Sequence, residues 1–172
     1  MKLGKHDIGR LFHLLDAELA SREVVGEVYL VGGAVMCLAL NARDATAAID
    51  SLFQPTRAVR EAASRVAIAA GVADTWLNDA VKGFLSPRGE FDVYLELAHL
   101  RVFTARPEYL LAMKAAAMRL GAEFHDLDDV RFLLRYLNIT DAEEAMQVVI
   151  RYFDERQLLP KTRLALEELL AG

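Results

Sequence analysis

The stretch that decides the fold is residues 28–53, V-Y-L-V-G-G-A-V-M-C-L-A-L-N-A-R-D-A-T-A-A-I-D-S-L-F. It begins with a short apolar run, typical of a buried strand, that ends at Gly32-Gly33. A helix-like apolar segment follows, and a second strand-like run then holds Asp50. The order predicts a strand, a glycine turn, a helix and a returning strand.

The glycine pair has two interpretations. Two glycines between a strand and a helix leave backbone N–H groups where a phosphate can bind. The same pair also occurs in a tight connection that needs only the backbone freedom of glycine. The strand with Asp50, about 17 residues after Gly33, leaves room for one helix and a return. This second strand favours the phosphate site.

Asp50 is the candidate ligand for Mg²⁺, because a carboxylate at a strand end can hold that ion against a phosphate. An Asp-x-Asp pair on one strand would supply two carboxylates, since residues i and i+2 share a face. Here the partner position is Ala48. Asp92, in F-D-V-Y-L, is the candidate for an additional metal carboxylate from a third strand. An outward-facing polar residue is the alternative for Asp92.

Lys114 is the single charged residue between positions 109 and 118. Burying an isolated ammonium is costly, so the side chain either extends to solvent or meets a phosphate or carboxylate. Asp126, Asp128 and Asp129 open the next predicted helix. These acids can compensate the helix dipole, and they also suit a Lys–Asp pair that lines a cleft.

Composition narrows the class of protein. The chain has 172 residues, 54% hydrophobic and 26% charged, which predicts a globular protein and argues against disorder. Its formal net charge of −5 disfavours a general nucleic-acid coat. Cys37 is the only cysteine, and the four histidines lack metal-ligand spacing. No signal pattern or apolar run of about 20 residues is present, so we expect a cytoplasmic protein that does not span a membrane.

The pattern predicts an α/β fold, with a small mixed sheet, packed helices and a C-terminal helical bundle. We expect an α/β core over residues 1–106 and a helical part over residues 107–172, packed as one unit. The expected strands are 28–31, 49–53, 91–97 and 100–104, and the expected helices are 7–21, 33–41, 57–70, 78–85, 108–120, 128–137, 141–153 and 161–170. Thr56 is the expected N-cap of helix 57–70, and Thr140 with Glu143 fits a capping box before helix 141–153.

At these residues the chain resembles the minimal nucleotidyltransferases of the DNA polymerase beta superfamily. More narrowly, it resembles the AbiEii/MenT-type toxin nucleotidyltransferases of bacterial toxin–antitoxin systems. The superfamily pattern is a Gly-Gly or Gly-Ser pair opening a helix, followed by Asp-x-Asp on the next strand. Here it is Gly32-Gly33 and Asp50. The narrower pattern adds P-E-Y-L-L-A-M-K, ending at Lys114, and an acidic element beginning at Asp126, so the resemblance covers roughly residues 28–135.

The resemblance implies transfer of a nucleoside monophosphate from an NTP to an acceptor hydroxyl, with Mg²⁺ as cofactor. Gly32 and Gly33 would hold the triphosphate, Asp50 would bind metal, and Lys114 would contact phosphate. Asp126 would complete the catalytic site as a base or electrostatic partner. RNA, including tRNA, is the expected acceptor, and a cognate antitoxin is the expected protein partner.

Ala48 departs from the family pattern, because it removes the first metal carboxylate. The chain is either a natural pseudoenzyme or an inactivated form of an otherwise active toxin, and the remaining motifs favour the inactivated enzyme. A catalytically inactive nucleotidyltransferase-fold protein with a binding or regulatory role is the competing hypothesis. Mg²⁺-dependent NTP binding, with and without Ala48→Asp, would discriminate the two.

Overall fold

The computed structural model describes residues 2–117 and 126–171. The chain forms two compact units. One contains Met1–Gly83 and Phe91–Ala105, and the other contains Phe84–Glu90 and Arg106–Gly172. The expected division lay between residues 106 and 107. In the structure the chain passes into the helical unit between Ala105 and Arg106, and residues 84–90 also belong to that unit.

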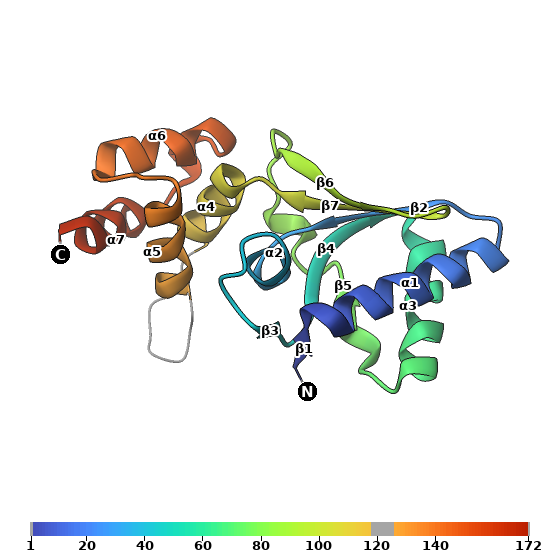
Figure 1. The fold of residues 1–172 in the computed structure, drawn as a ribbon. Coiled ribbons are helices and arrows are strands. Elements are labelled where there is room, and N and C mark those ends of the chain that lie inside the picture. Colours follow the sequence, from blue (N-terminus) through green and yellow to red (C-terminus); the bar gives the residue numbers. More distant parts are fainter. Residues whose placement is uncertain (1, 118–125, 172) are drawn as a thin grey trace. The chain divides into compact units, whose positions relative to one another are not determined.

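The first unit is an α/β unit built on a five-stranded sheet (Figure 1). Its elements are β1 (Leu3–Gly4), α1 (Lys5–Ser21), β2 (Gly26–Leu30), α2 (Gly33–Leu38), β3 (Ala45–Thr46), β4 (Ile49–Gln54), α3 (Thr56–Ala70), β5 (Leu77–Asn78), β6 (Phe91–Glu96) and β7 (Leu100–Ala105). The strand order is β5-β4-β2-β7-β6, and β1 pairs separately with β3. β2 is antiparallel to β4 and parallel to β7, so the predicted mixed α/β sheet is confirmed.

Helices α1 and α3 lie together along one face of this sheet (Figure 1). Gly26 of β2 marks how closely they approach, since a Cβ atom there would lie 2.9 Å from Leu19 Cδ1 and 3.1 Å from Val59 Cγ2. The apolar stripe of α1 is fully buried: Ile8, Leu11, Phe12, Leu15 and Leu19. Burial of this stripe is the main stabilising contribution of the helix.

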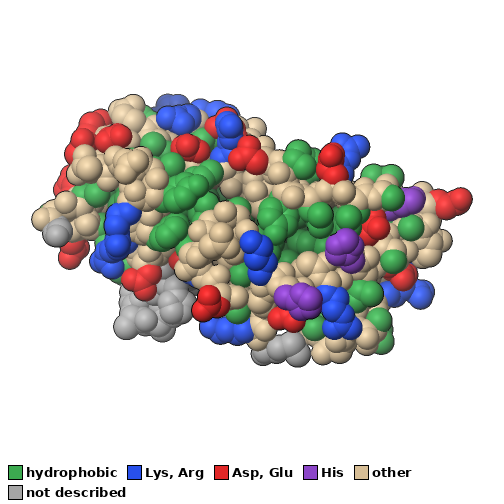
Figure 2. All heavy atoms as spheres, in the orientation of Figure 1, with side chains coloured by type: hydrophobic (Ala, Val, Ile, Leu, Met, Phe, Trp, Pro, Cys, Tyr) green, Lys and Arg blue, Asp and Glu red, His purple; other side chains and the backbone are tan. Residues whose placement is uncertain are grey.

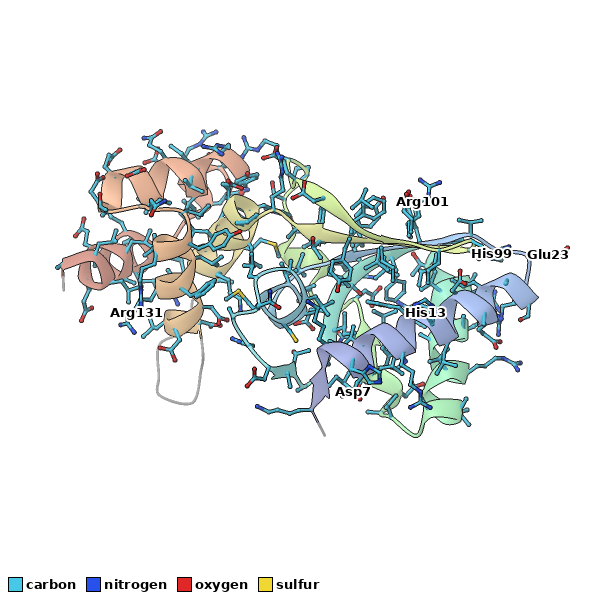
Figure 3. All side chains as sticks on the ribbon, viewed as in Figure 1. Asp7, His13, Glu23, His99, Arg101 and Arg131 are labelled. Atoms are coloured by element: carbon cyan, nitrogen blue, oxygen red, sulfur yellow. The ribbon has the colours of Figure 1, made fainter. Side chains whose placement is uncertain are left out.

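The opposite face of the sheet is more exposed. In β4, Ile49, Ser51 and Phe53 are buried. Of the alternating positions, Asp50 is half-buried and Leu52 is exposed. On the same face, Tyr29 stacks on Phe103 with ring centroids 4.7 Å apart. Figure 3 shows Arg101 of β7 pointing away from α1, on this face. Asp50 therefore projects from the side of the sheet that α1 and α3 leave open.

The helical unit consists of α4 (Pro107–Ala116), α5 (Asp126–Tyr136), α6 (Ala142–Tyr152) and α7 (Pro160–Ala171). Residues 84–90 pack onto it. The Ser86 backbone N–H donates to Tyr109 Oη at 3.0 Å, and the Ser86 hydroxyl donates to the carbonyl of Tyr152. Gly89 leaves room for the buried Tyr109 ring, because a Cβ atom at 89 would lie 2.5 Å from it. These contacts explain why the segment belongs to this unit.

Several predicted boundaries were wrong. The helix expected at 78–85 is absent, because residues Leu77–Asn78 form β5 beside β4, and Lys82–Phe84 make only one 3-10 turn. The N-cap of α6 is Asp141, whose Oδ1 accepts from the Glu144 N–H at 2.8 Å, and not Thr140. Thr56 is already the first residue of α3. The expected end of helix 108–120 lies outside the described residues.

None of the helices in residues 2–117 and 126–171 combines the length and apolar character needed to cross a bilayer.

A hydrogen bond in the helical unit makes its stability depend on pH. Tyr152 Oη donates to Glu90 Oε1 at 2.5 Å, which holds the pKa of Glu90 below its ordinary value of 4.5. Burial, and then the same bond, raises the pKa of Tyr152 to about 12. Because unfolded Glu90 binds its proton more tightly, this stabilisation is present above about pH 4.5 and is lost as the pH falls through the lowered pKa.

We therefore expect Tyr152→Phe to lower stability at pH 7 and to reduce the difference in stability between pH 7 and pH 3. Urea unfolding midpoints at the two pH values measure this difference. The Glu143 carboxylate, which bonds Gln147 and Arg163 instead, keeps its own acid dependence in both proteins. A Tyr152→Phe protein whose midpoint falls as steeply as that of the parent would contradict the expectation.

Candidate functional site

The glycine turn connects β2 to α2. Gly32 has φ +71°, in the left-handed region where a side chain is strained, and its carbonyl accepts from the Val35 N–H at 3.1 Å. A Cβ atom on Gly32 would lie 3.3 Å from Asp50 Oδ2. Glycine at 32 thus serves both the backbone conformation and the close approach of the Asp50 carboxylate.

Asp50 reaches the turn because β4 pairs with β2. Leu30 and Ser51 are opposite each other in the antiparallel pair, and the Val31 N–H donates to the Asp50 carbonyl at 3.0 Å. Gly32 follows Val31 directly, so the turn after β2 lies beside the Asp50 side chain. The structure therefore brings Gly32 and Asp50 together, and their role in one phosphate and metal site stays a prediction.

Ala48 lies in the bend just before β4, which begins at Ile49. Strand alternation therefore does not by itself place residue 48 beside Asp50. A hydrogen bond does relate it to the turn, since the Thr46 hydroxyl donates to the Ala48 carbonyl at 3.0 Å. Thr46 Oγ1 in turn lies 2.9 Å from the position a Cβ atom would take on Gly33. Thr46 thus links position 48 to the glycine pair, because its hydroxyl bonds the Ala48 carbonyl and lies next to Gly33.

Arg43 is a residue of the site that the sequence analysis missed. A Cβ atom on Gly33 would lie 3.1 Å from Arg43 Nη1, so the guanidinium borders the glycine pair. The loop between α2 and β3 holds Arg43, and β3 is fixed by pairing with β1, where Thr46 is opposite Leu3. A lone arginine in a loop gives no local signal, because its contact with Gly33 depends on this pairing.

Asn78 was also missed, because its segment was predicted as helix. In the parallel pair β4/β5, Asn78 is the register partner of Asp50, which puts the two side chains on one face of the sheet. The Asn78 amide donates to the Thr75 carbonyl at 3.3 Å, and its Oδ1 accepts from the Ala80 N–H at 3.3 Å. Asn78 therefore organises the turn next to Asp50.

Asp92 is not brought to Asp50. Its register partner on β7 is Thr104. Thr104 is in turn the partner of Leu30 on β2, and Leu30 is the partner of Ser51 on β4. Partners in a sheet share a face and consecutive residues alternate, so Asp92 lies on the face opposite Asp50. The two strands are also separated by three spacings of about 4.8 Å each. The register thus gives no support to Asp92 as a third metal carboxylate.

The donor set for Mg²⁺ is incomplete in this chain. Asp50 supplies one carboxylate at the glycine turn, and position 48 supplies none. Within residues 2–117 and 126–171, no group of three or more His, Cys, Asp or Glu side chains could hold a metal ion. Enzymes that transfer phosphoryl groups usually hold their metal ions between two carboxylates, so one carboxylate is too few ligands for such a site. The glycine turn of the chain with Ala48 therefore does not fit Mg²⁺ well.

The second predicted group of residues lies in the helical unit. Lys114 Nζ lies 2.7 Å from Asp129 Oδ2 and 3.9 Å from Asp126 Oδ1. The Lys114 side chain is 17% exposed, and those of Asp126 and Asp129 are 8% and 5% exposed. The predicted Lys–Asp pair is therefore present, formed between the end of α4 and the start of α5. Asp128 is exposed and contacts Arg131, which Figure 3 marks on α5.

The two groups belong to different units. Gly32, Gly33 and Asp50 are in the α/β unit, and Lys114 and Asp126 are in the helical unit. We predicted that Lys114 shares a cleft with Gly33 and Asp50. These residues are in different units, so this stays a prediction.

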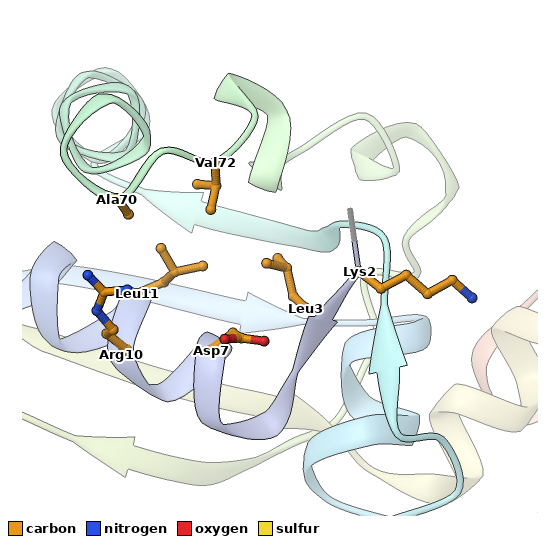
Figure 4. A pocket seen from close by; sticks show the side chains of 7 residues that line it. All are labelled: Lys2, Leu3, Asp7, Arg10, Leu11, Ala70 and Val72. Atoms are coloured by element: carbon orange, nitrogen blue, oxygen red, sulfur yellow. The ribbon is translucent and has the colours of Figure 1, made fainter.

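A pocket of about 280 Å³ lies elsewhere in the α/β unit, among β1, α1 and the end of α3 (Figure 4). Its lining includes Lys2, Asp7 and Arg10, together with apolar side chains. Neither glycine of the turn nor Asp50 contributes to it. The pocket is therefore distinct from the glycine turn.

Comparisons with protein-family models, curated proteins and solved structures found no match to this chain.

Proposed function

We propose that this chain is a nucleotidyltransferase of the toxin type whose metal site is incomplete at position 48. The observation that carries the proposal is the 3.3 Å approach of Asp50 Oδ2 to the Cβ position of Gly32. A glycine turn with a carboxylate beside it suits a phosphate group that is held by backbone N–H groups and bridged to the carboxylate by a cation. We expect Ala48 to leave the chain inactive or impaired.

The reaction is an in-line displacement at phosphorus. A hydroxyl oxygen of the acceptor bonds to the α-phosphorus of an NTP, the bond from that phosphorus to the bridging oxygen breaks, and pyrophosphate leaves. The hydroxyl proton passes to a general base. When bound, Mg²⁺ would stabilise the charge that develops on the phosphate oxygens. Gly32 and Gly33 hold the phosphates in this scheme.

The acceptor we propose is RNA, with tRNA as the first substrate to test, and the protein partner is a cognate antitoxin in the cytoplasm. On the face drawn in Figure 2, basic and acidic side chains are interspersed. Together with the net charge of −5, this favours a restricted contact with an exposed RNA 3′ end over binding along a duplex.

The test of the proposal is Ala48→Asp. We expect this substitution to produce Mg²⁺-dependent NTP binding, because a second carboxylate, at a position that Thr46 links to the glycine pair, supplies the charge that a hard divalent cation needs. Affinity for NTP in the presence of Mg²⁺ should rise by about 10- to 100-fold, the range seen when groups that support a metal site are changed. Calorimetric titration of each NTP, with Mg²⁺ and with EDTA, measures the change.

The matched control places the same carboxylate on an exposed alanine of the same unit, as in Ala47→Asp. This variant adds the same charge one residue away, in the same bend. It should leave NTP binding unchanged. A folded Ala48→Asp protein whose NTP affinity in Mg²⁺ equals that of Ala47→Asp would overturn the two-carboxylate account.

A further inference from the structure

The loop between α2 and β3 is attached to the rest of the α/β unit on both sides of Arg43. Before it, Asn41 has φ +52° and accepts a hydrogen bond from Lys5 Nζ at 3.4 Å, and the Ala42 N–H donates to the Met36 carbonyl at 2.7 Å. After it, β3 pairs with β1. The position of Arg43 beside the glycine turn is thus built into the fold.

Opposite charges border the two glycines. Arg43 Nη1 lies 3.1 Å from the Cβ position of Gly33, and Asp50 Oδ2 lies 3.3 Å from the Cβ position of Gly32. A phosphate at the turn would meet a planar guanidinium, which can donate two parallel hydrogen bonds to phosphate oxygens. It would also meet one carboxylate, which repels it.

We propose that Arg43 binds the phosphates of the nucleoside triphosphate directly, so that this chain binds the triphosphate without a divalent cation. The inference rests on the proposed function, because it takes the glycine turn as the phosphate site. With alanine at position 48, this position adds no second negative charge to that of Asp50. The ligand class is a polyphosphate, and neither Arg43 nor the glycines read a base. Affinities for the four NTPs and for inorganic tripolyphosphate should therefore be similar.

The direct experiment is calorimetric titration of the unsubstituted protein with ATP and with inorganic tripolyphosphate in EDTA. Binding should be detectable, and Arg43→Ala should weaken it by about tenfold or more, the effect of losing hydrogen bonds to a charged group. Arg57→Ala is the matched control, since Arg57 is in the same unit and its side chain is 92% exposed. The control should bind ATP like the parent.

A second variant keeps the test decisive if Arg43→Ala fails to fold. Asp50→Asn removes the carboxylate that repels the phosphates, so it should tighten ATP binding in EDTA in the protein with Ala48. In the Ala48→Asp background the same change removes a metal ligand and should abolish the Mg²⁺-dependent binding. Opposite signs in the two backgrounds separate binding by Arg43 from binding through a metal.

The outcomes distinguish this inference from the proposed function. Absence of ATP and tripolyphosphate binding in EDTA, equal affinity of the Arg43→Ala protein, or weaker binding by Asp50→Asn would each overturn the role of Arg43. If Ala48→Asp nevertheless gains Mg²⁺-dependent binding, the nucleotidyltransferase proposal survives. EDTA-insensitive binding by the parent, with no gain in Ala48→Asp, would support Arg43 and reject the two-carboxylate metal site.

Discussion

The Ala48→Asp protein should label RNA with a nucleotide from an NTP, whereas the protein with Ala48 should not. We expect at least about a 100-fold difference in transfer, because the introduced carboxylate completes the metal site that stabilises the charge on the reacting phosphate. The assay incubates total tRNA with each labelled NTP and Mg²⁺ and separates the products on a gel. The labelled NTP that gives product identifies the preferred nucleotide.

Transfer should require the whole proposed site. Adding Asp50→Asn to the Ala48→Asp protein should abolish labelling, and Ala47→Asp alone should give none. Robust labelling by the protein with Ala48 would show that the account of the metal site is wrong. Label on a protein partner, with none on RNA, would keep the nucleotidyltransferase and remove RNA as its acceptor.

Lys114→Ala should destabilise the helical unit by about 3–5 kcal/mol, the cost of breaking a buried ion pair by removing one partner. Lys114 lies 2.7 Å from Asp129 Oδ2 and 3.9 Å from Asp126 Oδ1, and both carboxylates are buried. Removing the ammonium leaves two negative charges with one less cation in a site with little water. Hydrogen exchange of the α4 and α5 amides, and the urea unfolding midpoint, measure the loss.

Matched variants separate charge from packing. Lys161→Ala removes an exposed lysine of the same unit and should change stability by less than about 0.5 kcal/mol. Lys114→Met with Asp129→Asn removes both charges of the short pair and should recover part of the loss. Equal stabilities of Lys114→Ala and Lys161→Ala would contradict the buried pair. Lys114→Arg, which keeps the charge, is then the variant for testing nucleotide binding.

Local patterns predicted most of the elements. The apolar stripe of α1, the alternation in β6 and β7, and the run that ends at Gly32-Gly33 each depend on residues close in the chain, and the structure has these elements. The segment after Trp76 was mispredicted as a helix because a two-residue strand has no period to detect. Leu77 and Asn78 become a strand only because β4 lies beside them.

The candidate site divides in the same way. The glycine pair, Asp50 and Lys114 were singled out because each stands out against an apolar background in the sequence. A pair of Lys114 with an acid of the next helix was predicted, with Asp126 as the favoured acid, but Asp129 is the closer partner at 2.7 Å, against 3.9 Å for Asp126. Asp92 shows the same alternation as Asp50, yet the register puts it on the other face of the sheet. A two-residue period in the sequence shows that neighbouring side chains point to opposite faces of the sheet. It does not show which face each set of side chains occupies.

The sequence by itself determined that a strand, a glycine turn and a helix precede a strand with one carboxylate, because these are features of short segments. It also determined that position 48 holds an alanine and therefore supplies no carboxylate. Only the tertiary structure decided that Arg43 borders Gly33, since that contact requires Leu3 of β1 to pair with Thr46 of β3. Pairing between residues so far apart depends on packing of the whole α/β unit, and it leaves no pattern in either segment.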